Sequence, residues 1–115
     1  MENRLSPEDK NLLLQIAREA IVSNIETGCT PRLEPPNPVL QEKRGCFVCV
    51  KINGKLRGCI GNFISDKPLY QLVQEMAISA ATRDPRFYPM KKADLVQFDV
   101  HRRVVGRART GGVVT

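Results

Sequence analysis

Apolar side chains recur every three or four residues near the start of the chain, which predicts an amphipathic helix over residues 7–27. Ser6 can cap this helix, Pro7 suits its first turn, and Gly28 is a typical stop. The apolar positions are Leu12, Leu13, Ile16, Ala17, Ala20, Ile21 and Ile25. We therefore expect one face of this helix to pack against a core.

Two apolar runs flank Asn53-Gly54, which predicts a β-hairpin with a type I′ turn. A two-residue loop would oppose Ile52 to Lys55, Val50 to Arg57, Val48 to Cys59 and Cys46 to Gly61. Paired residues share a face, so Arg57 and Cys59 should lie on the face of Cys46, Val48, Val50 and Ile52. The other face would carry Phe47, Cys49, Leu56, Gly58 and Ile60. Both faces are mostly apolar, so the hairpin should be largely buried.

A second helix is predicted over residues 68–82, where apolar and small side chains again follow a helical period. It should end before Asp84, because a residue that precedes proline is disfavoured in the helical region. Val96, Phe98 and Val100 alternate with polar residues and suggest a third strand. Together these elements predict an α+β fold, with an antiparallel sheet built on a central hairpin and flanked by helices.

Composition fits one globular domain: of 115 residues, 42% are hydrophobic and 26% are charged. No apolar run reaches the ~18 residues of a membrane span, and the first ten residues lack the apolar centre of a signal peptide. We therefore expect a cytoplasmic protein that does not enter a membrane.

The net charge of +6 is concentrated at the end of the chain. Residues 101–115 hold four arginines and no acid, which sets them apart as a basic tail. A basic tail can bind phosphate, but this one has no aromatic side chain for base stacking. Nucleic-acid binding therefore ranks last among the functions considered.

Four cysteines, Cys29, Cys46, Cys49 and Cys59, raise the question of metal or redox chemistry. Residues three apart on a strand point to opposite faces, so Cys46 and Cys49 should not share a metal, and no metal is expected. In the predicted register Cys46 is the diagonal neighbour of Cys59, which leaves a redox pair between them open. A cytoplasmic chain would otherwise keep its thiols reduced.

The segment Leu56-Arg57-Gly58-Cys59-Ile60-Gly61 is the main candidate site. If Arg57 lies beside Cys59, its charge favours the thiolate, which is the reactive form of cysteine. Gly58 and Gly61 leave room for another backbone to approach. The alternative is that Cys59 only packs in the core and Arg57 pairs with an acid such as Asp84.

This segment, followed by Pro68-Leu69 and by Ala81-x-x-Asp84-x-Arg86-Phe87-x-Pro89-Met90, resembles the AMMECR-type domain. The family takes its name from a human gene of the Alport syndrome, mental retardation, midface hypoplasia and elliptocytosis region. Prokaryotic members are similar to the A component of the AmmeMemoRadiSam system, alongside a Memo-like protein and a radical SAM protein. The resemblance implies an α+β fold and marks Arg57, Gly58, Cys59, Gly61, Asp84, Arg86 and Phe87 as motif positions, with no role assigned to any of them.

The resemblance runs from Ser6 to Val100, so we expect a partial family domain over residues 1–100. Residues 101–115 would be a basic tail, disordered or foreign to the family. Two main functions follow. The first is a thiol-dependent enzyme or enzyme component, with Cys59 as nucleophile and Arg57 as its electrostatic partner, acting with Memo-like and radical SAM proteins. The second is a non-catalytic interaction module. No cofactor is expected for either.

Overall fold

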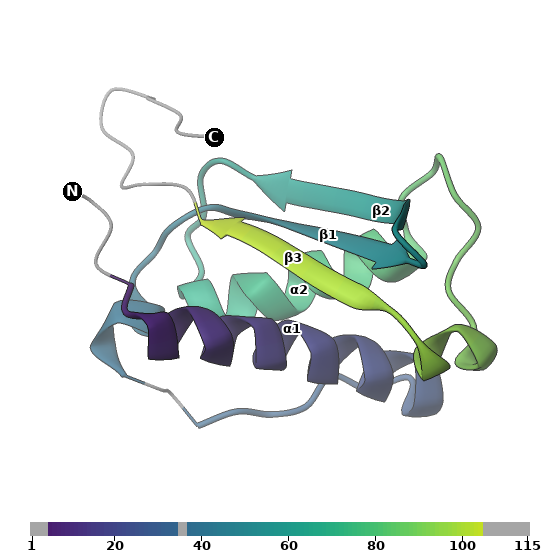
Figure 1. The fold of residues 1–115 in the computed structure, drawn as a ribbon. Helices are drawn as coiled ribbons and strands as arrows, with labels where there is room; N and C mark the ends of the chain where they lie inside the picture. The colour runs from purple at the N-terminus through teal and green to yellow at the C-terminus, as the bar shows by residue number, and fades with distance from the viewer. Residues whose placement is uncertain (1–4, 35–36, 105–115) are drawn as a thin grey trace.

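The computed structural model describes residues 5–34 and 37–104 as two helices packed on one face of a three-stranded antiparallel sheet (Figure 1). In chain order the elements are α1 (Pro7–Thr27), the 3₁₀ turn η1 (Pro38–Gln41), β1 (Cys46–Ile52), β2 (Lys55–Asn62), α2 (Leu69–Thr82), the 3₁₀ turn η2 (Lys92–Val96) and β3 (Asp99–Val104). The strands lie in the order β2-β1-β3. The predicted α+β class and both predicted helices are confirmed.

Helix α1 begins and ends where the sequence indicated. The Ser6 side chain accepts the amide hydrogen of Asp9, and the Asp9 carboxylate accepts that of Ser6, which forms a capping box. At the other end Gly28 adopts a left-handed conformation, with φ of 79°, and its amide donates to the Asn24 carbonyl.

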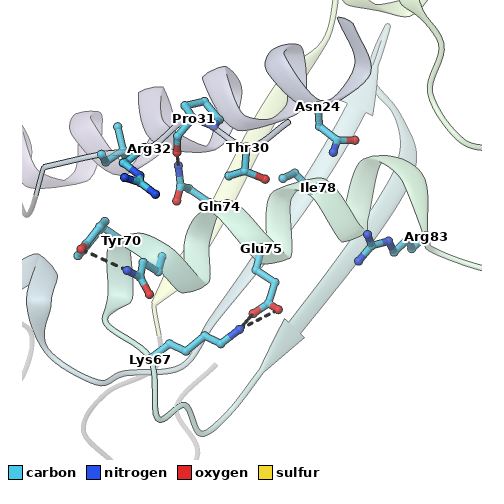
Figure 2. A pocket seen from close by; sticks show the side chains of 12 residues that line it. Asn24, Thr30, Pro31, Arg32, Lys67, Tyr70, Gln74, Glu75, Ile78 and Arg83 are labelled. Atoms are coloured by element: carbon cyan, nitrogen blue, oxygen red, sulfur yellow. Dashed lines mark hydrogen bonds and ion pairs between the residues drawn. The ribbon is translucent and has the colours of Figure 1, made fainter. Parts of the chain in front are cut away.

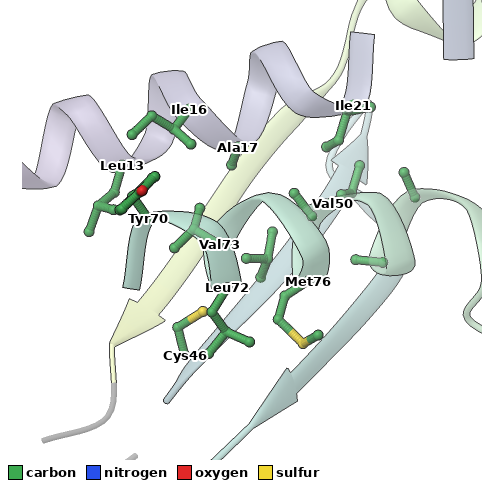
Figure 3. Close-up of a cluster of buried hydrophobic side chains, with 14 of the residues drawn as sticks. Leu13, Ile16, Ala17, Ile21, Cys46, Val50, Tyr70, Leu72, Val73 and Met76 are labelled. Atoms are coloured by element: carbon green, nitrogen blue, oxygen red, sulfur yellow. The ribbon is translucent and has the colours of Figure 1, made fainter. Parts of the chain in front are cut away.

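The core lies between the helices and the sheet (Figure 3). Buried side chains of three elements meet there: Leu13, Ala17 and Ile21 of α1, Leu72, Val73 and Met76 of α2, and Cys46, Val48 and Val50 of β1. Helix α2 is buried along most of its length because it packs against both α1 and the first two strands. Only one face of β1 contributes to this core, as the alternation of buried and half-buried residues along the strand shows.

The type I′ turn is confirmed, because Asn53 and Gly54 have φ of 53° and 79°. The predicted pairing of Ile52 with Lys55 is also correct. Beyond Lys51 and Leu56, however, the register shifts, so that Val50 pairs with Gly58 and Arg57 is an extra residue in β2. The predicted pairs of Val50 with Arg57, Val48 with Cys59 and Cys46 with Gly61 are therefore wrong.

The bulge at Arg57 has a physical reason in the packing of β2 against α2. A Cβ atom on Gly58 would lie 1.7 Å from the carbonyl oxygen of Ala80, so only glycine allows this close approach of strand and helix. The predicted register would instead have turned Arg57 towards the core. The bulge moves Gly58 and Ile60 to the helix side and moves Cys59 to the open side, where it pairs with Cys49.

The third strand begins later than the alternation of Val96, Phe98 and Val100 predicts. Val96 ends the 3₁₀ turn η2 and is exposed, and Phe98 is buried before the strand begins at Asp99. β3 runs across the expected domain boundary at residue 100 and pairs with β1 as far as Val104. The rest of the expected tail, including Arg107 and Arg109, lies outside the described residues.

Candidate functional site

The two sequence blocks that carry the family resemblance meet in space. The carboxylate of Asp84, just after α2, accepts the amide hydrogen of Cys59 at 3.0 Å. Arg86 donates from its own amide, its Nε and its Nη2 to the same carboxylate, at 3.1, 2.9 and 2.6 Å. Its Nη2 also lies 3.5 Å from the carbonyl oxygen of Cys59. Asp84 and Arg86 therefore contact both backbone polar groups of Cys59, its N–H and its C=O.

The electrostatics of this cluster favour a fixed ion pair. Asp84 is buried, and the hydrogen bond from Arg86, together with the amide of Cys59, holds the pKa of its carboxyl well below the usual range. The same pairing raises the pKa of Arg86. A carboxylate that is ionised and accepts four hydrogen bonds is not available to carry protons. Asp84 therefore acts as a clamp on β2.

Arg57 has no cross-strand partner in β1, so the pairing with Val50 that the predicted register gave it is not formed. Its Nη2 donates to the carbonyl oxygen of Tyr88 at 3.1 Å and lies 3.9 Å from the carboxylate of Asp94. Both partners belong to the connection between α2 and β3. Arg57 thus attaches the bulged part of β2 to that connection. Asp84, at the start of the same connection, attaches to β2 through the amide of Cys59.

The other motif residues also make close contacts within the fold. The guanidinium of Arg86 lies 5.3 Å from the ring centroid of Phe87, within the range of a cation–π contact. Gly61 lies against Phe47, whose ring would be 2.4 Å from a Cβ atom at that position. The structure therefore brings Gly58, Cys59, Asp84 and Arg86 together, while Arg57 and Gly61 lie at the margins of that cluster.

The thiol of Cys59 is joined to that of Cys49 by a disulfide across β1 and β2, with an S–S distance of 2.06 Å. The redox pair of Cys59 with Cys46, which the predicted register left open, is not formed, since Cys46 is a free, buried cysteine on the helix side of β1. Cys49 also pairs directly with His101 of β3. Cys59, Cys49 and His101 therefore form one row across three strands on the open face of the sheet.

A hollow of about 410 Å³ lies over this row. Its lining includes Cys49, Cys59 and His101, together with Phe47 and Phe63, whose ring centroids are 4.9 Å apart. The hollow thus combines an apolar floor with two sulfur atoms and an imidazole. Such a lining can hold an apolar group of a substrate against a disulfide or a pair of thiols.

Cys49, His101 and Phe63 were missed as site residues at the level of sequence. The predicted register placed Cys49 on the opposite face from Cys59, and His101 was assigned to a tail rather than to a strand. Gly58 is the sequence feature that could have indicated them, because a glycine inside a strand often marks a bulge or a close approach of another backbone. A bulge next to Gly58 moves the following residues of β2, including Cys59, to the opposite face of the sheet.

Within residues 5–34 and 37–104 no group of three or more His, Cys, Asp or Glu side chains is placed to hold a metal ion. Neither helix in these ranges has the length and apolar character needed to cross a membrane.

Comparison with known proteins agrees with the sequence resemblance. Residues 14–110 match the model of the AMMECR1 family. Protein MK0488 of Methanopyrus kandleri is 46% identical over 93 residues, which cover 79% of this chain and 45% of that protein. A protein of Methanothermobacter thermautotrophicus is 42% identical over 102 residues, which cover 88% of this chain and 53% of the relative.

The fold also has a solved counterpart. The crystal structure of the uncharacterised protein PH0010 from Pyrococcus horikoshii matches with a TM-score of 0.80 and 34% sequence identity, over 90% of this chain and 54% of that one. The chain spans about half the length of the relatives that it matches. With most of its residues matched by the family model, the chain belongs to the AMMECR1 family.

Proposed function

We propose that Cys49 and Cys59 form a redox-active cysteine pair that exchanges thiols and disulfides with a substrate held in the hollow on the open face of the sheet. The observation that supports this most directly is the row of Cys59, Cys49 and His101 across three strands. In the cytoplasm, where we place the protein, the pair would start as two thiols.

The exchange would proceed in two balanced steps. Directly paired residues on neighbouring strands have Cβ atoms about 5 Å apart, so the imidazole of His101 can accept the proton of the Cys49 thiol. The Cys49 thiolate attacks one sulfur of a substrate disulfide, forms a mixed disulfide and releases the first substrate thiolate. The Cys59 thiolate then attacks the Cys49 sulfur, closes the Cys49–Cys59 bond and releases the second. Two electrons pass to the substrate, and the two thiol protons accompany them.

The surrounding motif would serve this chemistry by positioning it. Asp84 accepts a hydrogen bond from the backbone N–H of Cys59, and Arg86 donates one to its carbonyl oxygen. Arg57 ties down the bulge that turns Cys59 to the open face, so in this proposal it is a positioning residue and not the partner of a thiolate. The proposal keeps Cys59 of the expected segment as one of the two reacting sulfurs, but the attacking thiol is Cys49 of β1, with His101 as its neighbour.

A test compares fully reduced protein variants in their reaction with 5,5′-dithiobis(2-nitrobenzoic acid), an aromatic disulfide. In the intact pair the reaction should release two aromatic thiols and leave no aryl adduct on either cysteine, because the pair closes on itself. Cys49→Ser and Cys59→Ser should each retain a stable aryl adduct on the remaining cysteine, seen by mass spectrometry. Cys29→Ser is the matched control, since Cys29 is an exposed cysteine outside the pair.

The proposal is overturned if the protein with both cysteines also carries stable aryl adducts on Cys49 and Cys59. His101→Phe gives a second readout. It should slow the exchange about 100-fold, the lower end of what a general base contributes, and leave the stoichiometry unchanged.

A second candidate, a non-catalytic interaction module, is supported by the apolar side chains at the edge of the same face. Phe63 is 43% exposed, lines the hollow and packs against the ring of Phe47. Ile64, the next residue in the sequence, is 68% exposed. The partners that we propose for either function are the Memo-like and radical SAM proteins. Co-purification with those two proteins that is lost in Phe63→Ser, but kept in Cys49→Ser, would favour the module over the redox pair.

A further inference from the structure

A separate, polar groove of about 490 Å³ runs along α2 on the helix side of the molecule (Figure 2). Its floor is formed by side chains of α2 at helical spacing, from Tyr70 through Gln74 to Ile78. The segment Thr30–Leu33, which follows α1, forms the opposite wall. The groove shares no residue with the hollow over the cysteine pair.

The charges in this groove are not balanced. Its lining includes three basic side chains, Arg32, Lys67 and Arg83, and one acidic side chain, Glu75. Lys67 lies 3.0 Å from both carboxylate oxygens of Glu75, so these two charges neutralise each other. Arg32 and Arg83 make no ion pair with any part of the chain that the structure describes. Figure 2 shows them towards opposite ends of the groove.

Between the arginines lies a fixed hydrogen-bond acceptor. Gln74 is only 6% exposed, and its Nε2 donates to the carbonyl oxygen of Pro31 at 2.9 Å. This bond orients the amide, and Figure 2 shows its remaining oxygen on the side away from Pro31. An acceptor that is buried and oriented in this way suits a ligand that carries hydroxyl groups.

We propose that this groove binds a small, elongated anion: a molecule with a phosphate at each end and hydroxyl groups between them. Arginine is the residue that matches phosphate geometry with two parallel hydrogen bonds, and one arginine is available for each end. The volume falls within the ~300–1,000 Å³ of small-molecule sites. Tyr70 is the one aromatic residue of the lining and its ring is buried in the core, so the groove offers no platform for a nucleobase. This favours a sugar bisphosphate over a nucleotide.

The experiment measures binding by calorimetry with two probes, fructose 1,6-bisphosphate and fructose 6-phosphate, at low salt. The bisphosphate should bind at least tenfold more tightly than the monophosphate. Arg32→Gln and Arg83→Gln should each weaken the bisphosphate to about the affinity of the monophosphate. The monophosphate should respond to one of these substitutions and not to the other. Arg103→Gln is the matched control, because Arg103 is an exposed arginine on the open face of the sheet.

Both arginines are exposed, so their substitution should leave the fold intact, which circular dichroism of each variant checks. Equal affinity for the two probes, or bisphosphate binding that survives both substitutions, would overturn the proposal. Tighter binding of an acidic peptide than of the bisphosphate would also overturn it. The result is independent of the cysteine pair, so the inference stands or falls separately from the proposed redox function.

Discussion

The carboxylate of Asp84 accepts the backbone amide of Cys59 across 25 positions of sequence, at 3.0 Å. This contact joins the end of α2 to the strand that carries one half of the cysteine pair. Asp84→Asn would remove the negative charge and replace one carboxylate oxygen, an acceptor, with an NH₂ group, a donor. The amide of Cys59 and the N–H groups of Arg86, which point at this position, are also donors. We expect a lower denaturant midpoint for this variant, whereas Asp66→Asn, at an exposed position, should leave the midpoint unchanged. An unchanged midpoint in Asp84→Asn would contradict the clamp.

Acid should weaken the same contact in a defined direction. The hydrogen bonds from Arg86 and Cys59 lower the pKa of Asp84 in the folded state, so its stabilising effect is complete above the unfolded pKa of about 3.9. That effect is lost as the pH falls below this value towards the folded pKa. Denaturant midpoints measured between about pH 6 and pH 2 should therefore decline less steeply below pH 4 for Asp84→Asn than for the parent chain. Parallel declines would count against the ion pair.

Gly58 should tolerate no larger side chain. A Cβ atom would lie 1.7 Å from the Ala80 carbonyl oxygen, which belongs to helix backbone and cannot rotate away. We expect Gly58→Ala to destabilise by about 2–3 kcal/mol, measured by chemical denaturation, because β2 and α2 would have to separate. A loss below about 0.5 kcal/mol would show that strand and helix are not in such close contact.

Substitution of Gly54 in the hairpin turn should destabilise the protein less than substitution of Gly58. Gly54 has φ of 79°, which a β-branched residue resists. Gly54→Val should therefore destabilise by about 1 kcal/mol or more, although nothing lies within 4 Å of a Cβ atom there. Because the site is sterically open, any loss measured at Gly54 reports backbone conformation alone, in contrast to the loss at Gly58.

The elements set by local chemistry were predictable, and those set by tertiary contacts were not. The capping residues Ser6 and Gly28 and the turn residues Asn53 and Gly54 act within a few positions of sequence, and all four behave as expected. The register of β2 depends instead on Ala80, 22 positions from Gly58, whose carbonyl oxygen excludes a side chain there. Because Arg57 is an extra residue in β2, Cys59 lies on the opposite face from the one predicted and pairs with Cys49.

The four cysteines should separate into three classes of reactivity. Burial raises the pKa of the Cys46 thiol to about 12, so this residue should stay unmodified by iodoacetamide at pH 8 in folded protein. Intact mass should show one adduct without reductant, on the exposed Cys29, and three after gentle reduction opens the Cys49–Cys59 bond. A fourth should appear only on unfolding. Modification of Cys46 in the folded state would contradict its burial.

Arg102 offers a position at which a substitution should raise stability. It pairs with Val48 on the helix side of the sheet, where burial lowers its pKa, and its Nε is buried without a hydrogen-bond partner among the described residues. Arg102→Leu would remove this unsatisfied donor and add apolar surface next to Val48. We expect a gain of about 1 kcal/mol in the free energy of unfolding, measured by urea denaturation. Arg103→Leu, the adjacent residue on the open face, should change it by less than about 0.5 kcal/mol. Destabilisation by Arg102→Leu would mean that the guanidinium makes a favourable contact that outweighs its buried Nε.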